Sequence, residues 1–317
     1  MTVMTMTAVS RPTLAGLLRR AFGDRLREGE PMSRHTSARI GGPADFFVGV
    51  DSANELAEAV REALRCGARF FVLGAGSNIL ASDRGVRGLV IKNRTSAITF
   101  AERGETIIVR AESGVGLPTL ARQCVLRGAA GLEWAATVPG TVGGAVVGNA
   151  GAHGSDTAAC LRLATILQGN GGVREYSKAD LKFAYRKSAL KNGERAVVLS
   201  AEFALKRGDP NELQARVDSF IMHRKRTQPP GASIGSMFKN PPGDYAGRLI
   251  EVAGLKGMRI GKAEISPIHA NFFVNLGGAS ANDVYSLISL AQSKVREKFG
   301  VELELEIELV GDWGGQC

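Results

Sequence analysis

A glycine-dense run from Val138 to Gly151, VPGTVGGAVVGNAG, distinguishes this sequence. Residues this small leave backbone N–H groups uncovered by side chains, and close approach to a planar, phosphorylated ligand requires such a backbone. A flexible surface loop is the alternative interpretation, but the valines and the proline within the run favour an ordered segment. Glycine makes up 40 of the 317 residues, about 13% against a typical ~7%. The sequence therefore predicts many turns, or many places where backbone approaches a ligand.

Length and composition predict a globular protein of about two domains. The 317 residues are 44% hydrophobic, which is enough to fill a core in each domain. No run of about 18 apolar residues occurs, and Met1–Ser10 lacks the basic and apolar segments of an export signal. The four cysteines are far apart and too few for a disulfide scaffold. We expect a cytoplasmic protein without membrane association, whose thiols are reduced and mostly buried.

The net charge of +9, from 40 basic and 31 acidic residues, favours anionic partners. Only 6% of the residues are aromatic, and no stretch interleaves aromatic with basic residues as a base-stacking surface would. Small phosphorylated ligands are therefore favoured over nucleic acid, and a basic RNA-binding module is the non-enzyme alternative. Four scattered histidines without H-x-x-x-H spacing, and no paired cysteines, predict that there is no metal site.

The first third of the chain predicts the order β-α-β-loop-β. Asp45–Val50, Phe70–Leu73 and Gly88–Ile91 are apolar runs typical of strands. Ser52-x-x-Glu55 is a capping box that opens a helix through Leu64.

A second α+β unit is expected after this segment. It contains strands at Thr106–Arg110, Leu161–Leu167 and Val197–Leu205, and a helix that Pro118 opens and Gly128 closes. The glycine-rich stretch from Gly131 to Gly154 is expected to interrupt regular structure. A linker is expected at Lys206–Pro210.

A third unit follows Pro210. A helix runs to about Arg226 and is broken by Gln228-Pro229-Pro230-Gly231. A strand near Asn271–Leu276 and a helix from Asn282 to Phe299 come next. Glu302–Val310, ELELEIELV, alternates glutamates with apolar residues, which predicts a strand with one buried face.

The first strand-loop junction, Leu73-Gly74-Ala75-Gly76-Ser77-Asn78, contains a G-x-G pattern. Ile79 occupies the position where the Rossmann G-x-G-x-x-G motif has its third glycine, and no phosphate-loop pattern occurs anywhere. A tight turn is the simpler interpretation. Its free amides and polar side chains could still line a phosphate or ribose as a backbone nest.

Six motifs in order connect the sequence to a known family. They are Arg39-Ile40-Gly41-Gly42-Pro43-Ala44, Leu73–Asn78, Val138–Gly151, Tyr185-Arg186-x-Ser188, Gly235-Ser236-Met237-Phe238-Lys239-Asn240-Pro241 and Gly254-Leu255-Lys256-Gly257. Together they resemble the UDP-N-acetylenolpyruvoylglucosamine reductase family, from about Arg34 to Gly311. One such motif is weakly specific, whereas six in order over nearly the whole chain are strongly specific.

The resemblance implies an α+β fold. A two-part FAD-binding domain of the vanillyl-alcohol oxidase type, residues 1–98 and 99–209, precedes a smaller α+β substrate domain, residues 210–317. It also implies non-covalent FAD, NADPH as co-substrate, and reduction of the enolpyruvyl ether of UDP-N-acetylglucosamine to UDP-N-acetylmuramate for peptidoglycan. The partner is then a small nucleotide sugar, with no nucleic acid and no obligate protein partner. The chain lacks a tyrosine-bearing insertion after Tyr185-Arg186, so it resembles the shorter class of the family.

The resemblance makes the two glycine loops the expected FAD contacts. The implied residues are Gly74, Ala75, Gly76, Ser77, Asn78, Pro139, Gly140, Thr141, Gly143, Gly144, Asn149 and Gly151.

Three residues are the implied catalytic groups. The reaction needs a hydride on one alkene carbon, supplied by flavin N5, and a proton on the other. The motif match makes Ser236 the proton donor and Arg186 the group that holds the substrate carboxylate. The family's third catalytic residue, a glutamate, aligns with Glu306. Periodicity does not select it among four glutamates of a face that is otherwise solvent-exposed, and it could act as an acid only if burial raises its pKa.

Tyr185, Lys239 and Asn240 are the expected substrate contacts. The basic run Arg224-Lys225-Arg226 either assists them or forms the solvated end of a helix. Glu308 stands where many relatives have a basic residue. The same fold also carries oxidases with histidine-linked flavin, for which His153 after the second glycine loop needs a check.

Overall fold

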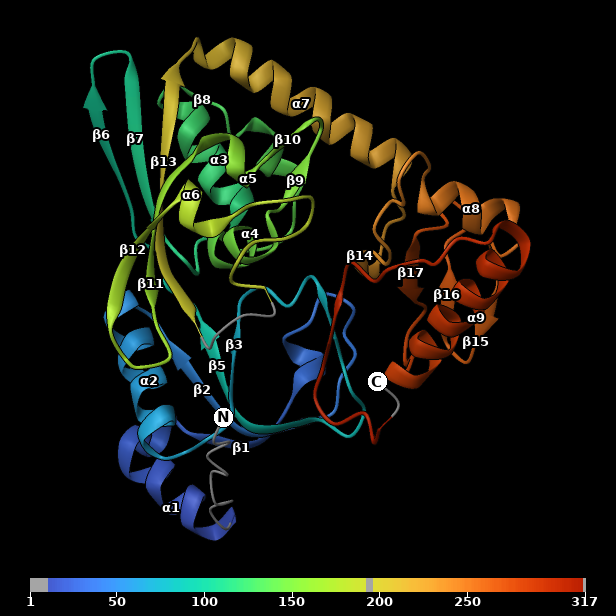
Figure 1. Ribbon diagram of the computed structural model, residues 1–317, viewed down its shortest axis with the longest axis horizontal. Coiled ribbons are helices and arrows are strands. Elements are labelled where there is room, and N and C mark those ends of the chain that lie inside the picture. The colour runs from blue at the N-terminus through green and yellow to red at the C-terminus, as the bar shows by residue number, and fades with distance from the viewer. Residues whose placement is uncertain (1–10, 192–195, 316–317) are drawn as a thin grey trace.

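The computed structural model describes residues 11–191 and 196–315. The expectations for Met1–Ser10 and for the Cys317 thiol lie outside these residues. Three sheets, each built mostly from one continuous part of the chain, organise the fold (Figure 1). No helix of the described part of the chain is both long and apolar enough to span a bilayer.

The first sheet has the strand order β1-β2-β5-β3. Its strands are β1 (Arg27–Pro31), β2 (Pro43–Val50), β3 (Phe70–Leu73) and β5 (Val86–Asn93). β5 is parallel to β2 and β3, and β1 is antiparallel to β2. α1 (Arg11–Phe22) and α2 (Ala53–Arg65) share its apolar core, and 3-10 turns occupy Gly23–Arg25 and Met32–Arg34.

The helix predicted after Ser52 is confirmed as α2. The Ser52 hydroxyl accepts a hydrogen bond from the backbone N–H of Glu55 at 3.2 Å. The Glu55 carboxylate accepts from the N–H of Asp51 rather than from that of Ser52, so the capping box is only half formed.

The second sheet is antiparallel, in the order β12-β11-β13-β7-β6, with β8 added to β13. Its strands are β6 (Ile98–Arg103), β7 (Thr106–Glu112), β8 (Ala129–Ala130), β11 (Leu161–Leu167), β12 (Val173–Ser177) and β13 (Val197–Arg207). α3 (Leu117–Leu126) has Pro118 in its first turn, and α5 (Thr157–Cys160) and α6 (Lys178–Leu181) are short. The predicted strands and α3 are confirmed, but the expected linker begins inside β13.

The glycine-rich stretch contains regular structure, contrary to the expectation. A 3-10 turn spans Glu133–Thr137, α4 spans Val142–Gly148, and β9 (Gly151–Ala152) pairs with β10 (Ser155–Asp156). Val142, Ala145 and Val146 form a buried face at i, i+3 and i+4 spacing. Packing of this face outweighs the low helix propensity of the glycines.

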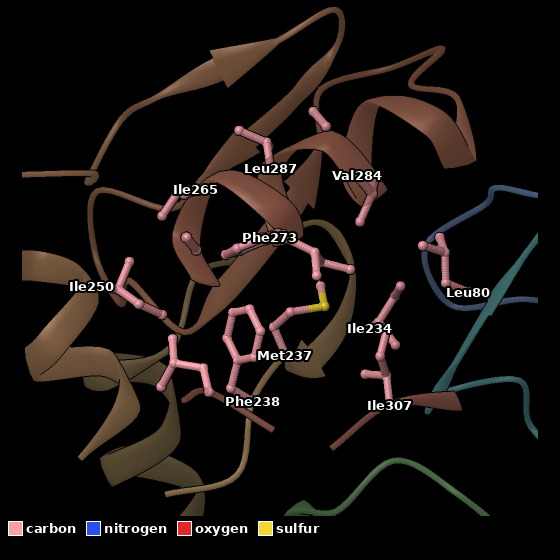
Figure 2. Packing of buried hydrophobic residues seen from close by; sticks show 14 of the residues in the cluster. Leu80, Ile234, Met237, Phe238, Ile250, Ile265, Phe273, Val284, Leu287 and Ile307 are labelled. Atoms are coloured by element: carbon pink, nitrogen blue, oxygen red, sulfur yellow. The ribbon is translucent and has the colours of Figure 1, made fainter. Parts of the chain in front are cut away.

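The long helix α7 (Pro210–Thr227) runs from the second sheet to the third (Figure 1). The third sheet is antiparallel, in the order β14-β17-β16-β15. Its elements are β14 (Ala232–Ser236), α8 (Ala246–Val252), β15 (Arg259–Ile260), β16 (Ala263–Ile265), β17 (Phe272–Asn275) and α9 (Ala281–Phe299). Figure 2 shows α9 side chains such as Leu287 packed over Phe273 and Ile265. The predicted α7, α9 and the strand near Asn271–Leu276 are confirmed.

The segment Glu302–Val310 differs from the predicted continuous strand. Only β18 (Glu308–Val310) is a strand, and it pairs in parallel with β4 (Ile79–Ala81). Upstream, the N–H of Lys239 donates to the Glu304 carbonyl, and the N–H of Glu306 donates to the Met237 carbonyl. The segment thus crosses from the third sheet to the first glycine loop, and Glu306 lies at the crossing.

Candidate active site

A cavity of about 650 Å³ lies where the two glycine loops meet the end of β14. This volume is within the range of small-molecule and cofactor sites. All three predicted catalytic residues, Ser236, Arg186 and Glu306, line it. So do most of the predicted cofactor contacts: Gly74, Ala75, Gly76, Ser77, Asn78, Pro139, Gly140, Thr141, Gly143, Gly144 and Gly151. Within the described residues no His, Cys, Asp and Glu cluster that could hold a metal ion occurs.

The two glycine loops are in direct contact. The Ser77 hydroxyl donates to the Pro139 carbonyl at 2.9 Å. A Cβ at Gly74 would lie only 2.5 Å from the Thr141 hydroxyl. Gly76 has φ +65° and leaves no room for a side chain beside the His35 carbonyl. Glycine at position 74 is therefore needed for the two loops to meet, and glycine at position 76 is needed for the first loop to pass the His35 carbonyl.

Lys92 on β5 contacts the first glycine loop, a role that the sequence did not predict. Its Nζ donates to the Gly74 carbonyl at 2.5 Å. Burial, assisted by the charge of Arg94, lowers the pKa of Lys92. Nothing in its sequence context separates this lysine from the other surface lysines.

The residues of α4 fit a large planar ligand such as FAD. Gly148 lines the cavity, and a Cβ there would meet no protein atom within 4 Å. A Cβ at Gly144 would meet only the Thr141 hydroxyl, at 3.8 Å. Side chains at these two positions would extend into open space beside the cavity, so their absence leaves room for a ligand against the helix backbone.

Ser236 is the last residue of β14, where the strand is irregular. The pairing of β14 with β17 shifts register between Ser233 and Ser236, and Gly235 in this interval has φ +85°. Irregularities of this kind re-aim a side chain at the end of a strand. Both Gly235 and Ser236 line the cavity.

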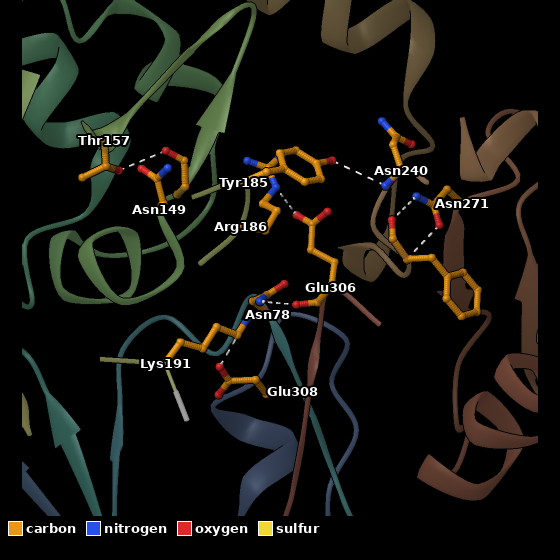
Figure 3. Close-up of polar contacts among 12 residues, drawn as sticks. Asn78, Asn149, Thr157, Tyr185, Arg186, Lys191, Asn240, Asn271, Glu306 and Glu308 are labelled. Atoms are coloured by element: carbon orange, nitrogen blue, oxygen red, sulfur yellow. Dashed lines mark hydrogen bonds and ion pairs between the residues drawn. The ribbon is translucent and has the colours of Figure 1, made fainter. Parts of the chain in front are cut away.

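Arg186 and Glu306 form an ion pair in the cavity wall (Figure 3). Nε of Arg186 lies 2.8 Å from Oε1 of Glu306, and the side chains are 23% and 17% exposed. The buried Nε–H makes no well-aligned hydrogen bond among the described residues, so its contact with Glu306 is mainly an attraction between opposite charges. Arg186 also adopts φ +55°, a conformation that is uncommon outside glycine and often occurs at functional sites.

Burial raises the pKa of Glu306 above its usual value. The nearby positive charges of Arg186, Lys191 and Lys239 oppose this effect without reversing it. The sequence requires burial to raise the pKa of Glu306 if this carboxyl is to act as an acid. The structure meets this requirement.

Four predicted site residues lie outside the cavity lining. Tyr185 is 55% exposed, and its hydroxyl is 3.5 Å from the N–H of Asn240. Lys239 pairs with Glu304 at 2.8 Å. Asn149 is 3% exposed, and its amide is bonded to protein groups. Tyr185 and Asn240 thus lie beside the Arg186 turn, and Asn149 is bonded to that turn through the Ala184 carbonyl.

Further charged and aromatic residues line the cavity. Lys191 Nζ lies 4.0 Å from Glu308 Oε1. His153 stacks on Phe220, and its Nε2 lies 3.1 Å from the Thr137 hydroxyl. His153, His223 and Arg224 also belong to the wall, whereas Lys225 and Arg226 are exposed. Of the three residues of the basic run, only Arg224 therefore lines the cavity, because it alone faces inward from the last turn of α7.

Two family models match the chain. The FAD binding domain model matches residues 44–177, and the model of the UDP-N-acetylenolpyruvoylglucosamine reductase C-terminal domain matches residues 227–310. The fold is therefore α+β, with an FAD-binding domain followed by the reductase's C-terminal domain. The predicted fold class is confirmed.

Relatives and a solved structure agree with these models. The chain is 46% identical to UDP-N-acetylenolpyruvoylglucosamine reductase 2 of Symbiobacterium thermophilum, over 92% of either chain. It is 47% identical to the Rubrobacter xylanophilus reductase, over 89% of this chain and 94% of the relative. The crystal structure of the Thermus caldophilus enzyme superposes with a TM-score of 0.77 at 37% identity, covering 90% of this chain and 99% of that one. This chain therefore belongs to the UDP-N-acetylenolpyruvoylglucosamine reductase family, the NADPH-using, FAD-dependent oxidoreductases of peptidoglycan precursor synthesis.

Proposed function

We propose that this chain reduces UDP-N-acetylenolpyruvoylglucosamine to UDP-N-acetylmuramate with Ser236, Arg186 and Glu306 as its catalytic residues. The observation that carries this assignment is their common cavity, in which Arg186 pairs with Glu306 while its buried Nε–H makes no well-aligned hydrogen bond to a described residue. A buried guanidinium N–H of this kind is well suited to a carboxylate.

The two glycine loops and α4 would hold FAD without a covalent bond to the protein. When bound, this cofactor would supply the hydride-transfer chemistry between NADPH and the substrate alkene. Arg186 binds the substrate carboxylate and stabilises the negative charge that builds on it during reduction. The Ser236 hydroxyl delivers a proton to the neighbouring carbon, which is basic enough to take it when the two are in contact. Glu306, whose pKa burial raises, lies beside that charge and can hold a further proton there.

The substrate partner is a UDP-sugar, and its anionic groups need positive charge outside the reacting centre. Arg224 and Lys191 in the cavity wall are suited to phosphate oxygens. Tyr185, Lys239 and Asn240, at the rim beside Arg186, would contact the sugar or diphosphate. No nucleic acid or obligate protein partner is required.

The unit boundaries at residues 98 and 209 also belong to this proposal. The first and third main sheets each lie within one of these units, and the second sheet lies within residues 99–209 apart from Ile98, the first residue of β6. The chain would work in the cytoplasm, as a member of the shorter class in which no tyrosine-bearing insertion covers the substrate.

Separate measurement of the two half-reactions tests the assignment. Ser236→Ala should leave anaerobic flavin reduction by NADPH unchanged, while reoxidation by the enolpyruvyl substrate slows by about 10²- to 10⁴-fold. Ser233→Ala, on the same strand but outside the cavity lining, is the matched control and should leave both rates unchanged. Equal loss of both half-reactions in Ser236→Ala would contradict the proton-donor role.

A further inference from the structure

We propose that three asparagine side chains are positioning residues, each fixing the backbone beside one of the three catalytic residues. The pairs are Asn78 with Glu306, Asn149 with Arg186, and Asn271 with Ser236. The inference deepens the proposed function and rests on its assignment of those three residues. It also gives Asn78 and Asn149 a role different from the cofactor contact that the sequence implies.

Asn78 binds the backbone directly after the Glu306 side chain, and its bond to Glu306 is drawn in Figure 3. Its Nδ2 donates to the carbonyl of Glu306 itself at 3.1 Å. Its own carbonyl accepts from the N–H of Glu308 at 2.9 Å. These two bonds begin the parallel pairing of β18 with β4 and fix the point at which Glu306 meets the first glycine loop.

Asn149 uses its whole amide group inside the protein. Its Nδ2 donates to the Asp156 carboxylate at 3.0 Å and to the Ala184 carbonyl at 3.1 Å. Its Oδ1 accepts from the N–H of Ala158 at 3.0 Å. With these three bonds made and only 3% of the residue exposed, Asn149 has little left for a ligand.

The Asn149 bond ends on the turn that carries Arg186. Ala184 and Lys187 close this turn through two backbone hydrogen bonds, and Arg186 within it has φ +55°. A second bond, from the Ser188 hydroxyl to the Val147 carbonyl at 2.7 Å, attaches the same turn to α4. The strained turn is thus fixed from both ends against the helix of the second glycine loop.

Asn271 binds the backbone just after Ser236. Its Oδ1 accepts from the N–H of Phe238 at 2.9 Å, and its Nδ2 donates to the Phe238 carbonyl at 2.8 Å. Its own carbonyl accepts from the N–H of Met237, the residue that follows Ser236. Asn271 is 4% exposed, so these bonds are shielded from water.

The three catalytic groups come from separate parts of the chain. They keep their relative positions only if contacts from other segments fix the backbone beside each of them. A displacement of about 1 Å in such a group can cost about 100-fold in rate. The short side chain of asparagine carries both a hydrogen-bond donor and an acceptor. It can therefore replace the backbone hydrogen bonds that a regular strand would make and an irregular segment lacks. This explains why the same residue type recurs beside each catalytic residue.

The test uses full-length, FAD-loaded protein and the variants Asn78→Ala and Asn149→Gly. Glycine is chosen at position 149 because that residue has φ +45°. Each variant should slow flavin reoxidation by the enolpyruvyl substrate by about 10- to 100-fold. The FAD dissociation constant and the rate of reduction by NADPH should stay within about twofold. A fall in FAD affinity with equal loss of both half-reactions would assign these asparagines to the cofactor and overturn the proposal.

Double-mutant cycles give the decisive readout. If Asn78 acts through Glu306, its effect should disappear in a Glu306→Ala background, and that of Asn149 should disappear in an Arg186→Ala background. Asn275→Ala is the matched control, because Asn275 makes three similar bonds to backbone groups away from the catalytic residues. It should lower the thermal midpoint without selectively slowing reoxidation, and its effects should add to those of either background.

The outcomes of these experiments distinguish a failure of the positioning role from a failure of the proposed catalytic residues. Full activity in Glu306→Ala and Arg186→Ala would refute the proposed function. Loss in those two variants, with additive effects of the asparagine changes, would refute the positioning role alone. Should Asn149→Gly fail to fold, the cycle of Asn78 with Glu306 decides the question, since Asn78 lies on an exposed loop.

Discussion

Nε of Arg186 lies 2.8 Å from Oε1 of Glu306, in the wall of the cavity that both glycine loops line. The pairing lowers the pKa of Glu306, but burial raises it more. The site therefore combines a fixed positive charge with a carboxyl group that retains a proton more readily than usual. In the proposed reaction, the positive charge would stabilise the negative charge that builds on the substrate carboxylate, and Glu306 would hold a proton beside it.

Arg186→Ala should slow flavin reoxidation by substrate by about 10²- to 10³-fold, the usual cost of removing one group that stabilises developing charge. Reduction by NADPH should stay near the wild-type rate. Arg186→Lys should restore little, because an ammonium cannot reproduce the paired guanidinium geometry. Arg174→Ala, which removes an exposed arginine, serves as control in the same stopped-flow experiment. Wild-type reoxidation in Arg186→Ala would remove this residue from the site.

The pH dependence of reoxidation should report on Glu306. Because burial raises the pKa of this carboxyl, it is protonated at low pH and loses its proton as pH rises through that raised value. If the protonated form is the active one, the rate should fall across that transition. Glu306→Gln cannot ionise and should lack the falling limb, with a lower but flatter rate. An unchanged pH profile in Glu306→Gln would show that another group titrates.

Gly148→Leu should prevent FAD binding while the protein still folds. A Cβ at this position meets no protein atom within 4 Å, so the larger side chain fills open space beside the cavity. We expect the stability of the apoprotein to change by no more than about 0.5 kcal/mol. Gly16→Leu is the control, since a Cβ at Gly16 in α1 also meets open space but is remote from the cavity. Normal FAD content in Gly148→Leu would place the cofactor elsewhere.

His269 should make the fold sensitive to acid. Burial lowers the pKa of His269, and its Nδ1 accepts a hydrogen bond from the N–H of Asn271 at 3.2 Å. The unfolded chain binds this proton below about pH 6.5, whereas the native state binds it only at lower pH. The stability contribution of neutral His269 is thus complete above that pH and is lost as pH falls. Urea unfolding between pH 7.5 and 5 should show a smaller decrease in His269→Asn than in the wild type, and equal slopes would contradict this account.

Elements with local signals were predictable from the sequence. Ser52 begins α2, Pro210 begins α7 and Gly300 ends α9, because caps and helix breakers act on their immediate neighbours. α4 was missed because its glycines oppose helix formation and only tertiary packing of Val142 and Val146 stabilises it. The strand predicted over Glu302–Val310 was too long. Alternation of apolar and charged residues indicates which side chains are buried, but not whether a neighbouring strand is available for pairing.

Only those site residues that belong to a recognisable motif could be predicted from the sequence. The resemblance brought together Ser236, Arg186 and Glu306, which periodicity alone could not connect. Lys92 was not selected by any motif, and Arg224 was named only as one of three residues of a basic run. Their roles depend on which way a strand or a helix turn faces in the folded chain. The interactions of Asn149 likewise depend on a turn that is distant in sequence.

The most direct test is the visible spectrum of the purified protein before and after acid precipitation, followed by anaerobic addition of NADPH and then of UDP-N-acetylenolpyruvoylglucosamine. We predict a yellow protein whose flavin is released by acid, loses colour with NADPH and regains it with the enolpyruvyl substrate. Colour that stays with the acid precipitate would indicate covalently bound flavin. Such a result, a colourless protein that cannot take up FAD, or a reduced flavin that the substrate does not reoxidise would contradict the account.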